Sequence, residues 1–284
     1  MKNKKLMLQM FAHAAQERYY SLVLAKLRKT SIFYSLANRS YEGTPTAGAV
    51  KIPVRDTEVE AKDYDKAKGG TLTTGTTTYQ TLPIDKDIYV NELIDGYDAA
   101  SVPDNIVADR LDSAGYSMGQ KVDNSIITIL TPETGTTASA GGTTALTKTN
   151  VYDTVIDDIQ AMKKKGVNVS EMWLAVTNAT YGLMLKCPEF IKASDLGDAV
   201  VQNGLVGKIG GVNVYETNQI EDTTKIEYIL GNRIFCHFVD EWITNVSVSD
   251  LKDGVHIGAS AVQGRRVFGA TLSRPSTVVV KKKA

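Results

Sequence analysis

The sequence predicts an α+β protein, and three segments in a fixed order support that prediction. A basic amphipathic N-terminal arm comes first, over residues 1–45. A long β excursion with a threonine- and glycine-rich tip follows from Val50 to Val90, and an uninterrupted helical stripe runs from Pro103 to Leu130. An exposed arm and an exposed β excursion cannot bury their own surface. The order therefore predicts a subunit whose projections are covered by neighbouring copies.

Composition allows a sizeable core and gives charge an uneven distribution. The chain has 284 residues, 43% hydrophobic and 23% charged, with 32 basic and 32 acidic side chains. Residues 1–40 hold eight basic side chains and one acid, so 8 − 1 = +7, whereas residues 85–112 hold two bases and eight acids, so 2 − 8 = −6. The basic arm suits a polyanion or the acidic strip of a neighbour, and two ordinary solvated faces are the alternative.

The two cysteines, Cys187 and Cys236, form neither a C-x-x-C pair nor a disulfide framework, which fits buried thiols in a reducing compartment. No apolar run approaches the roughly 18 residues needed to span a membrane. The N-terminus faintly imitates a signal peptide, but its apolar stretch is broken by Gln9, so we expect none.

The first half of the chain alternates between linkers and long elements. Residues 6–27 place apolar side chains near helical spacing, and residues 40–48 form a linker. Val50 to Arg55 and Tyr79 to Val90 alternate as strands around a polar tip. The stripe of the long helix steps by three and four residues, through Val107, Leu111, Ala114, Met118, Val122, Ile126 and Ile129.

The second half mixes helices and strands. We expect an exposed loop over residues 133–149, a helix from Val151 to the Lys163–Lys165 run before Gly166, and a short helix from Asn178 to Leu185. The expected strands cover residues 172–176, 209–216, 225–238, 243–248 and 278–281.

Few residues are suited to catalysis or metal binding. The histidines, His13, His237 and His256, lack zinc-type spacing to other ligands. Cys236 and His237 are neighbours on an expected strand, so their side chains point to opposite faces and a buried thiol is favoured over a nucleophile. We therefore expect no catalytic residue, no cofactor, no metal ion and no enzymatic activity.

Three further strings favour structural roles. Residues 204–211 imitate a phosphate loop, but Gln202 replaces the first glycine and Ile209 the hydroxyl residue, so a turn entering a strand is expected. Asp153, Asp157 and Asp158 predict a solvated helix face rather than an acid–base pair. Residues 265–266 and 281–283 are basic spots, expected to be solvated, with non-specific phosphate contact as the alternative.

At this point the order of segments resembles the tailed-phage major capsid proteins with the Hong Kong 97-type fold. The excursion is similar to that family's extended loop, and the Pro103–Leu130 helix to its spine helix. Residues 207–218 are similar to its glycine-turn-strand, and residues 269–280, with Arg274-Pro275 before a β-branched run, to its closing strand. Two departures stand out: no scaffolding extension of about a hundred residues precedes the arm, and no partner Asn or catalytic Glu identifies a crosslink for Lys66 or Lys68.

The resemblance implies a domain organisation and a function. It implies an N-terminal arm (1–45), an extended β loop (46–92), a peripheral domain with the spine helix (93–148), a mixed α/β axial domain (149–240) and a return to the peripheral domain (241–284). The implied function is self-assembly into the icosahedral shell that encloses the double-stranded DNA genome of a tailed phage. Implied partners are copies of the chain as hexamers and pentamers, a separate scaffolding protein, a portal and packaged DNA, with no membrane. The implied location is the virion, assembled in the host cytoplasm.

Three alternatives remain open on the sequence. A compartment shell of the encapsulin type would share the fold but hold protein cargo. A secreted β-rich adhesin would need a signal peptide and an anchor. A hydrolase would need a constellation of catalytic residues.

Overall fold

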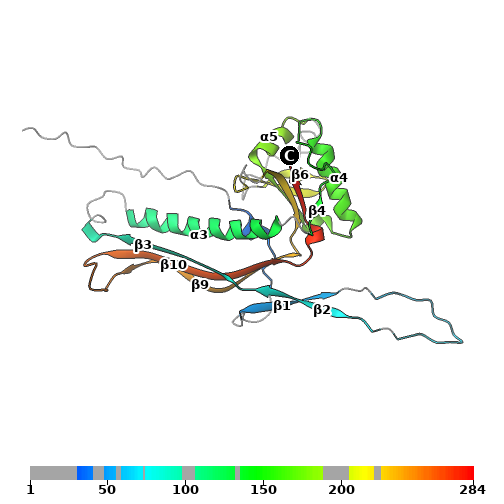
Figure 1. Ribbon diagram of the computed structural model, residues 1–284, viewed down its shortest axis with the longest axis horizontal. Coiled ribbons are helices and arrows are strands. Elements are labelled where there is room, and N and C mark those ends of the chain that lie inside the picture. Colours follow the sequence, from blue (N-terminus) through cyan, green and yellow to red (C-terminus); the bar gives the residue numbers. More distant parts are fainter. Residues whose placement is uncertain are drawn as a thin grey trace, which may run out of the picture.

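A computed structural model describes residues 31–40, 48–55, 59–72, 74–97, 106–131, 135–187, 205–220 and 225–284. The expected N-terminal helices and the first residues of the predicted long helix lie outside these ranges. Figure 1 shows a long sheet with one helix along it, a rounded lobe above one end, and a two-stranded arm that projects from the junction.

One part of the molecule is a three-stranded antiparallel sheet covered by one long helix. The sheet has the order β3-β10-β9, formed by β3 (Lys86–Ile94), β10 (Ser260–Leu272) and β9 (Cys236–Asp250). Helix α3 (Ile106–Leu130) packs along one face of this sheet (Figure 1). Its predicted stripe is confirmed as the buried side, because Ala114, Met118, Val122 and Ile126 are each at most 8% exposed.

The rounded lobe is built on a six-stranded mixed sheet in the order β4-β11-β8-β5-β7-β6. Its elements are β4 (Thr137–Ala138), α4 (Val151–Lys164), the 3₁₀ turn η2 (Val169–Glu171), β5 (Met172–Thr177), α5 (Asn178–Met184), β6 (Leu205–Ile209), β7 (Val212–Thr217), β8 (Ile226–Asn232), the 3₁₀ turn η4 (Pro275–Thr277) and β11 (Val279–Lys282).

Strand β5 is buried on both of its faces. Leu174 and Val176 join the cluster formed with α4, while Trp173 and Ala175 join the cluster that contains Val122 of α3. This second cluster also takes in Phe238 of β9 and Phe268 of β10. The two lobes are therefore joined by shared core packing and not by a linker alone.

Local sequence signals explain several element boundaries. Gly166 has φ +79°, which confirms the predicted left-handed position after α4. The Thr177 side chain accepts from the Thr180 amide and caps α5. Gly210 and Gly211, at φ +57° and +89°, form the two-residue turn between β6 and β7. The predicted 209–216 strand is therefore a hairpin, and the phosphate-loop imitation is its turn.

The predicted Tyr79–Val90 strand is wrong as a single element. The chain forms β2 (Thr77–Pro83), which pairs with β1 (Ala49–Arg55), and then β3, which pairs with β10. Pro83 has no amide hydrogen to continue a ladder, and the Ile84 amide donates instead to the Gly48 carbonyl at 3.1 Å. The β arm therefore ends at Pro83, and the next residues belong to the sheet under α3.

Two other strand predictions need correction. The predicted 225–238 strand is interrupted at residues 233–235, and β9 then runs through the predicted 243–248 strand as one long element. Most of β10 was not predicted from the residues, because Gly264, Arg265 and Arg266 interrupt its apolar alternation. The closing segment 269–280 comprises the end of β10, the η4 turn and the start of β11.

Candidate functional site

The outer face of the three-stranded sheet is an exposed surface with a regular side-chain pattern. Along β3 the side chains of Asp87, Tyr89, Asn91 and Leu93 are exposed, while Ile94 is buried. In the antiparallel register Arg265 lies opposite Tyr89, and Gln263 lies opposite Asn91. The inner face of the sheet is covered by α3, so this outer face is available to another molecule.

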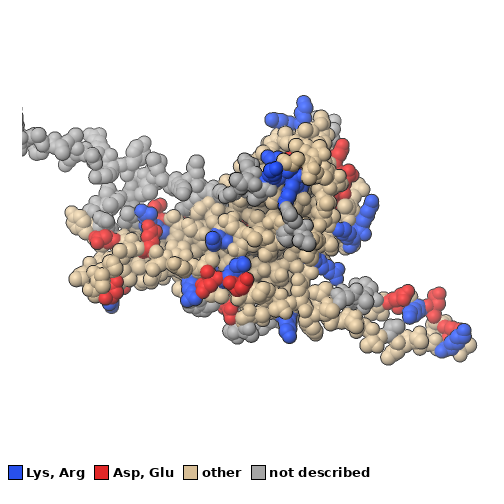
Figure 2. Space-filling model, in the orientation of Figure 1, with Lys and Arg blue, Asp and Glu red and all other residues tan. Residues whose placement is uncertain are grey.

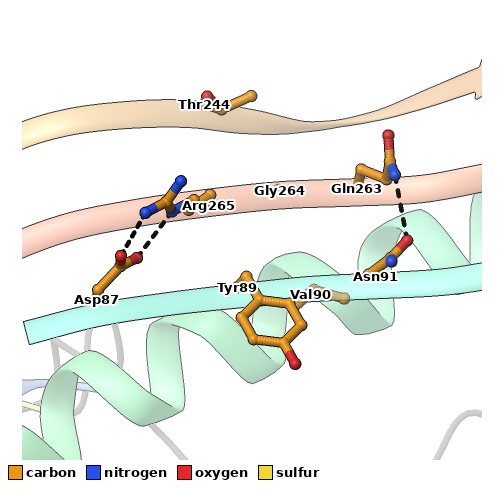
Figure 3. A pocket seen from close by; sticks show the side chains of 8 residues that line it. All are labelled: Asp87, Tyr89, Val90, Asn91, Thr244, Gln263, Gly264 and Arg265. Carbon is orange, nitrogen blue, oxygen red and sulfur yellow. Dashed lines mark hydrogen bonds and ion pairs between the residues drawn. The ribbon is translucent and has the colours of Figure 1, made fainter.

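Two polar pairs cross this face, one on either side of Tyr89 (Figure 3). Arg265 donates through Nε to Asp87 Oδ1 at 2.9 Å and through a terminal nitrogen to Oδ2. These hydrogen bonds and the positive charge of Arg265 lower the pKa of Asp87. Gln263 Nε2 donates to Asn91 Oδ1 at 3.2 Å. Tyr89 lies between the pairs with 75% of its side chain exposed.

These side chains line an open groove of about 590 Å³, whose lining is Asp87, Tyr89, Val90, Asn91, Thr244, Gln263, Gly264 and Arg265. The amides, the hydroxyl group and the aromatic ring can hold an extended chain. The lining lacks a thiol, an imidazole and paired carboxylates. Its hydrogen-bonding groups are of the kind that can hold a docked polypeptide.

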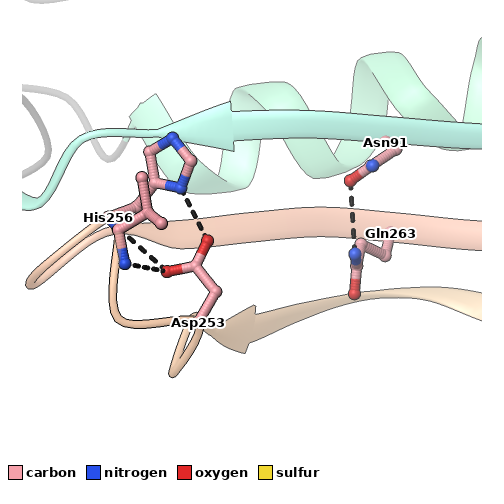
Figure 4. Close-up of polar contacts among 5 residues, drawn as sticks. Asn91, Asp253, His256 and Gln263 are labelled. Atoms are coloured by element: carbon pink, nitrogen blue, oxygen red, sulfur yellow. Dashed lines mark hydrogen bonds and ion pairs between the residues drawn. The ribbon is translucent and has the colours of Figure 1, made fainter.

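The far tip of the sheet carries apolar side chains on a turn held by hydrogen bonds to Asp253. Asp253 accepts from the amides of Val255 and His256 at 3.0 and 2.9 Å and from His256 Nδ1 at 2.7 Å (Figure 4). The backbone bond from His256, followed by its side-chain bond, lowers the pKa of Asp253. Ile257 is 92% exposed, and Val255 and Tyr97 are also largely exposed.

The β1–β2 arm is fixed at its root and exposed toward its end. At the root, Leu82 is fully buried, and Gly269 of β10 lies so close that a Cβ there would meet the Pro83 carbonyl oxygen at 2.2 Å. Toward the end, Val59, Tyr64, Leu72 and Tyr79 are each at least 65% exposed. Figure 2 shows acidic and basic side chains intermixed near the end of the arm.

Residues 31–34, which precede the β1–β2 arm, are bound to α3 by the buried carboxylate of Asp123. Asp123 accepts from Ser31 Oγ at 2.8 Å and from the amides of Ile32, Phe33 and Tyr34 at 2.8, 3.1 and 2.9 Å. It thereby supplies acceptors at the start of the short helix α1 (Phe33–Leu36). Burial raises the pKa of Asp123, and the four hydrogen bonds counteract that effect.

A second set of contacts holds the same segment on β9 and β10. Arg266 forms a two-point ion pair with Asp240 at 2.6 and 2.7 Å and lies over the Tyr34 ring. The Asn38 amide donates to the Cys236 carbonyl at 2.7 Å, and the Phe238 amide donates to the Asn38 carbonyl at 2.9 Å. Residues 31–38, the first part of the chain that the structure describes, are therefore held from both sides.

The structure shows the surroundings of the residues that the sequence analysis considered for catalysis or metal binding. Cys236 is buried, as predicted, and burial raises its pKa to about 12. His237 Nε2 lies 2.9 Å from Ser273 Oγ, and burial lowers its pKa. Within the described residues, no group of three or more His, Cys, Asp or Glu side chains could hold a metal ion.

Two predictions of solvated charge are wrong. Asp158 is buried and accepts from the Ala140 amide at 2.6 Å and from the Tyr228 hydroxyl at 2.5 Å, whereas Asp153 and Asp157 are exposed as predicted. Lys281 is fully buried, and its Nζ donates to the carbonyls of Gly141, Gly142 and Thr144 at 3.0, 2.7 and 2.8 Å. These contacts fix the loop after β4, which lies in the segment predicted as an exposed loop.

Comparison with known proteins decides the family. A profile of the phage capsid protein family matches residues 87–280, which is more than half of the chain. This chain belongs to the phage capsid protein family. It is a tailed-phage major capsid protein, and it forms part of the virion shell. No curated protein sequence matches the chain.

Solved phage capsid structures have the same fold at low sequence identity. The capsid protein matches a structure from Mycobacterium phage Che8 with a TM-score of 0.76 at 20% identity, over 95% of this chain and 98% of that one. It matches a capsid structure of cyanophage P-SCSP1u with a TM-score of 0.71 at 14% identity, covering 95% and 93% of the two chains.

A mature capsid of bacteriophage PhiM1 matches with a TM-score of 0.66 at 15% identity, over 94% of this chain and 91% of that one. The expected fold class is thereby confirmed, and the family match favours a phage shell over an encapsulin compartment or an adhesin. The family is structural. Among the described residues, no helix is long and apolar enough to cross a membrane.

Proposed function

We propose that the capsid protein closes its shell by exchanging exposed elements between copies and that this shell encloses double-stranded DNA. The observation that supports the exchange is the β arm: it is anchored at Leu82, yet its outer apolar side chains are uncovered within the chain. A lone two-stranded arm is marginally stable in water. Covering it with a neighbour removes that apolar surface from water and links the two copies.

The other exposed surfaces fit the same role. The grooved outer face of the sheet offers hydrogen-bonding groups, and the tip offers the apolar side chains of Val255 and Ile257. Specific interfaces bury about 1,200–2,000 Å² in total, and a protein with several separate surfaces can form several such contacts. Contacts between two different surfaces of the same protein are heterologous. They form a closed assembly when the rotation that relates neighbouring copies leads back to the first copy. We therefore propose capsomers of six and five copies that need no catalytic step and no cofactor.

Deletion of residues 71–78 tests the arm exchange. These residues form a polar part of the arm beyond its anchored root, so the deleted subunit should fold normally while its assembly is impaired or distorted. Circular dichroism and electron microscopy of the same preparation measure the two properties. Normal shells from the deletion variant would remove this part of the arm from the mechanism.

We further propose that the basic residues before Ser40 face the shell interior and contact packaged DNA without reading its sequence. The +7 balance of residues 1–40, in a chain of zero net charge, supports this orientation. Lysine and arginine near a duplex release counterions, which gives affinity that is independent of sequence and sensitive to salt. A separate scaffolding protein, a portal and assembly in the host cytoplasm complete the proposal.

Reversing three charges tests the DNA contact. Changing Lys26, Arg28 and Lys29 to Glu should leave empty shells intact and lower genome retention. Microscopy counts the shells, and the ratio of nucleic acid to protein absorbance measures the retained DNA. If empty shells also fail to form, the basic arm instead clasps a neighbouring subunit, for example at the acidic strip of residues 85–112.

A further inference from the structure

The first forty residues of the chain hold eight basic side chains, and the structure describes the surroundings of one of them, Arg39. The other seven lie before Ser31, outside the described ranges. The side chain of Arg39 is exposed to solvent. Its geometry therefore shows how one charge of this basic segment is presented to another molecule.

Arg39 is held by an aromatic ring. The central carbon of its guanidinium group lies over the Tyr34 ring, 4.4 Å from the ring centroid. A cation in this position is attracted by the negative face of the ring. Such a contact uses none of the N–H donors of the guanidinium group in a hydrogen bond. The side chain is therefore positioned while its donors remain available to an acceptor.

The ring under Arg39 is itself fixed by three contacts. The Tyr34 amide donates to Asp123 at 2.9 Å. The Tyr34 ring meets Phe238 edge-on, with centroids 5.2 Å apart and an interplanar angle of 86°. Arg266 also lies over the Tyr34 ring, at 4.9 Å from its centroid. Arg39 thus rests on a support that belongs to the core of the molecule.

The charge of Arg39 is not balanced by the residues around it. Arg266 is paired with Asp240 at 2.6 and 2.7 Å. In the part of the chain that the structure describes, no Asp or Glu side chain forms an ion pair with Arg39. Two guanidinium groups and one carboxylate therefore meet around Tyr34, a net charge of 2 − 1 = +1. An exposed guanidinium group with available donors suits a phosphate, which it can bind through two parallel hydrogen bonds.

We propose that Arg39, held on Tyr34, is a fixed contact for a phosphate group of the packaged DNA backbone. The inference rests on the proposed DNA contact of the basic residues before Ser40, and it assigns that contact a described side chain. Glu17 is the only acid among residues 1–40, which favours a phosphate over a carboxylate partner for this segment. A side chain that is already ordered loses less conformational freedom when it binds. Arg39 therefore adds affinity for DNA of any sequence.

The salt dependence of DNA binding tests the phosphate contact. Dissociated subunits are titrated against a short fluorescein-labelled DNA duplex, and fluorescence anisotropy measures the affinity at several salt concentrations. Each phosphate contact contributes about 0.9 to the slope of log affinity against log salt concentration. We expect Arg39→Ala to lower the slope by about 0.9 and Lys148→Ala, at an exposed site in the rounded lobe, to leave it unchanged. An unchanged slope for Arg39→Ala overturns the inference.

Three further variants separate the stacked geometry from the charge. Arg39→Lys keeps the charge and loses the planar group, Tyr34→Leu removes the ring, and Tyr34→Phe keeps it. We expect Arg39→Lys and Tyr34→Leu to weaken duplex binding at least about threefold, and Tyr34→Phe less than about 1.5-fold. Thermal unfolding checks that each variant is folded, and Arg39→Lys, at an exposed site, decides alone if Tyr34→Leu is not. Unweakened binding of Arg39→Lys, or equal binding of folded Tyr34→Leu and Tyr34→Phe, contradicts the stacked contact.

The same titration distinguishes this inference from the proposed DNA contact on which it rests. If changing Lys26, Arg28 and Lys29 to Glu weakens duplex binding while the Arg39 variants bind normally, the basic segment contacts DNA and the inference alone fails. If the unmodified subunits bind no duplex even at low salt, both fail. If Arg39→Ala lowers the yield of shells without changing duplex binding, Arg39 pairs with a carboxylate of a second copy and the inference is wrong.

Discussion

At the scale of single residues, two buried charged groups, Asp123 and Lys281, hold distant segments of the chain through hydrogen bonds. Asp123 binds three consecutive amides and one hydroxyl from residues 31–34, about ninety positions away in the sequence. Lys281 fixes three carbonyls of the loop after β4. Buried charges are costly unless hydrogen bonds compensate them, and these two groups are compensated by backbone atoms. Each therefore adds polar contacts to a segment that also packs in the core through apolar side chains such as Phe33 and Leu146.

Asp123→Asn tests the first of these anchors. The amide group replaces one acceptor oxygen by a donor, so at least one buried amide or hydroxyl loses its partner at a cost of about 1–3 kcal/mol. We expect a lower melting temperature and faster hydrogen exchange in residues 31–36. Asn124→Ala, at the exposed neighbouring position, is the control. Unchanged exchange in residues 31–36 of the Asp123→Asn variant would show that Asp123 is not the anchor.

His237 predicts how stability depends on pH. Burial lowers its pKa in the folded protein below the ordinary value of about 6.5. As pH falls through 6.5 the unfolded chain binds this proton first, so stability decreases until pH reaches the folded pKa, where the loss is complete. Urea unfolding of dissociated subunits between pH 7.5 and 5 measures the slope. His237→Gln should reduce it, and an identical slope in both proteins would exclude His237 as the source.

At the scale of elements, helices and strands with a regular apolar pattern could be predicted. Boundaries and strands that depend on contacts with distant elements could not. The stripe of α3, the fully buried β5 and the Gly166 stop after α4 each follow from local spacing. The end of the arm at Pro83 depends on tertiary packing against Gly269, and the course of β10 depends on ladders with β3 and β9. Neither is encoded in a local period.

The candidate surfaces were predicted only in outline. The threonines and glycines of the β excursion predicted an exposed arm. The paired side chains on the outer sheet face could not be predicted, because they depend on the β3–β10 register of the folded chain. Asp123 had one available signal: it is the acid in the last half of a helix whose neighbouring position, Val122, lies on the apolar stripe. Lys281 and Asp158 resembled ordinary surface charges because their partners are backbone atoms and a distant tyrosine.

Carboxylate substitutions along α3 test how its two halves contribute. Val122→Asp places a charge in the main core, where the side chain is 1% exposed, and we expect loss of soluble folded protein. Leu111→Asp lies against a small cluster and is only partly buried, so it should lower the melting temperature by less. Soluble yield and thermal unfolding of both variants provide the comparison. Near-normal melting of Val122→Asp would mean that this stripe is not a core face.

At the scale of the whole molecule, two packed lobes carry three uncovered surfaces. The lobes share a core through β5, α3, β9 and β10, so they form one body. The arm, the sheet tip and the outer sheet face keep exposed apolar or hydrogen-bonding groups that this body does not cover. Large exposed apolar patches on soluble proteins mark interaction sites. Because the chain belongs to the phage capsid protein family, we expect these surfaces to join many copies into a shell.

The central claim is that copies of the chain cover each other's exposed surfaces by assembling. Electron microscopy and sedimentation velocity of the purified chain test this claim most directly. The account predicts closed particles or capsomers, with little compact monomer at assembly concentrations, because the arm requires a neighbour to cover it. A population consisting only of compact monomers, whose arm resists proteolysis without any partner, would contradict it.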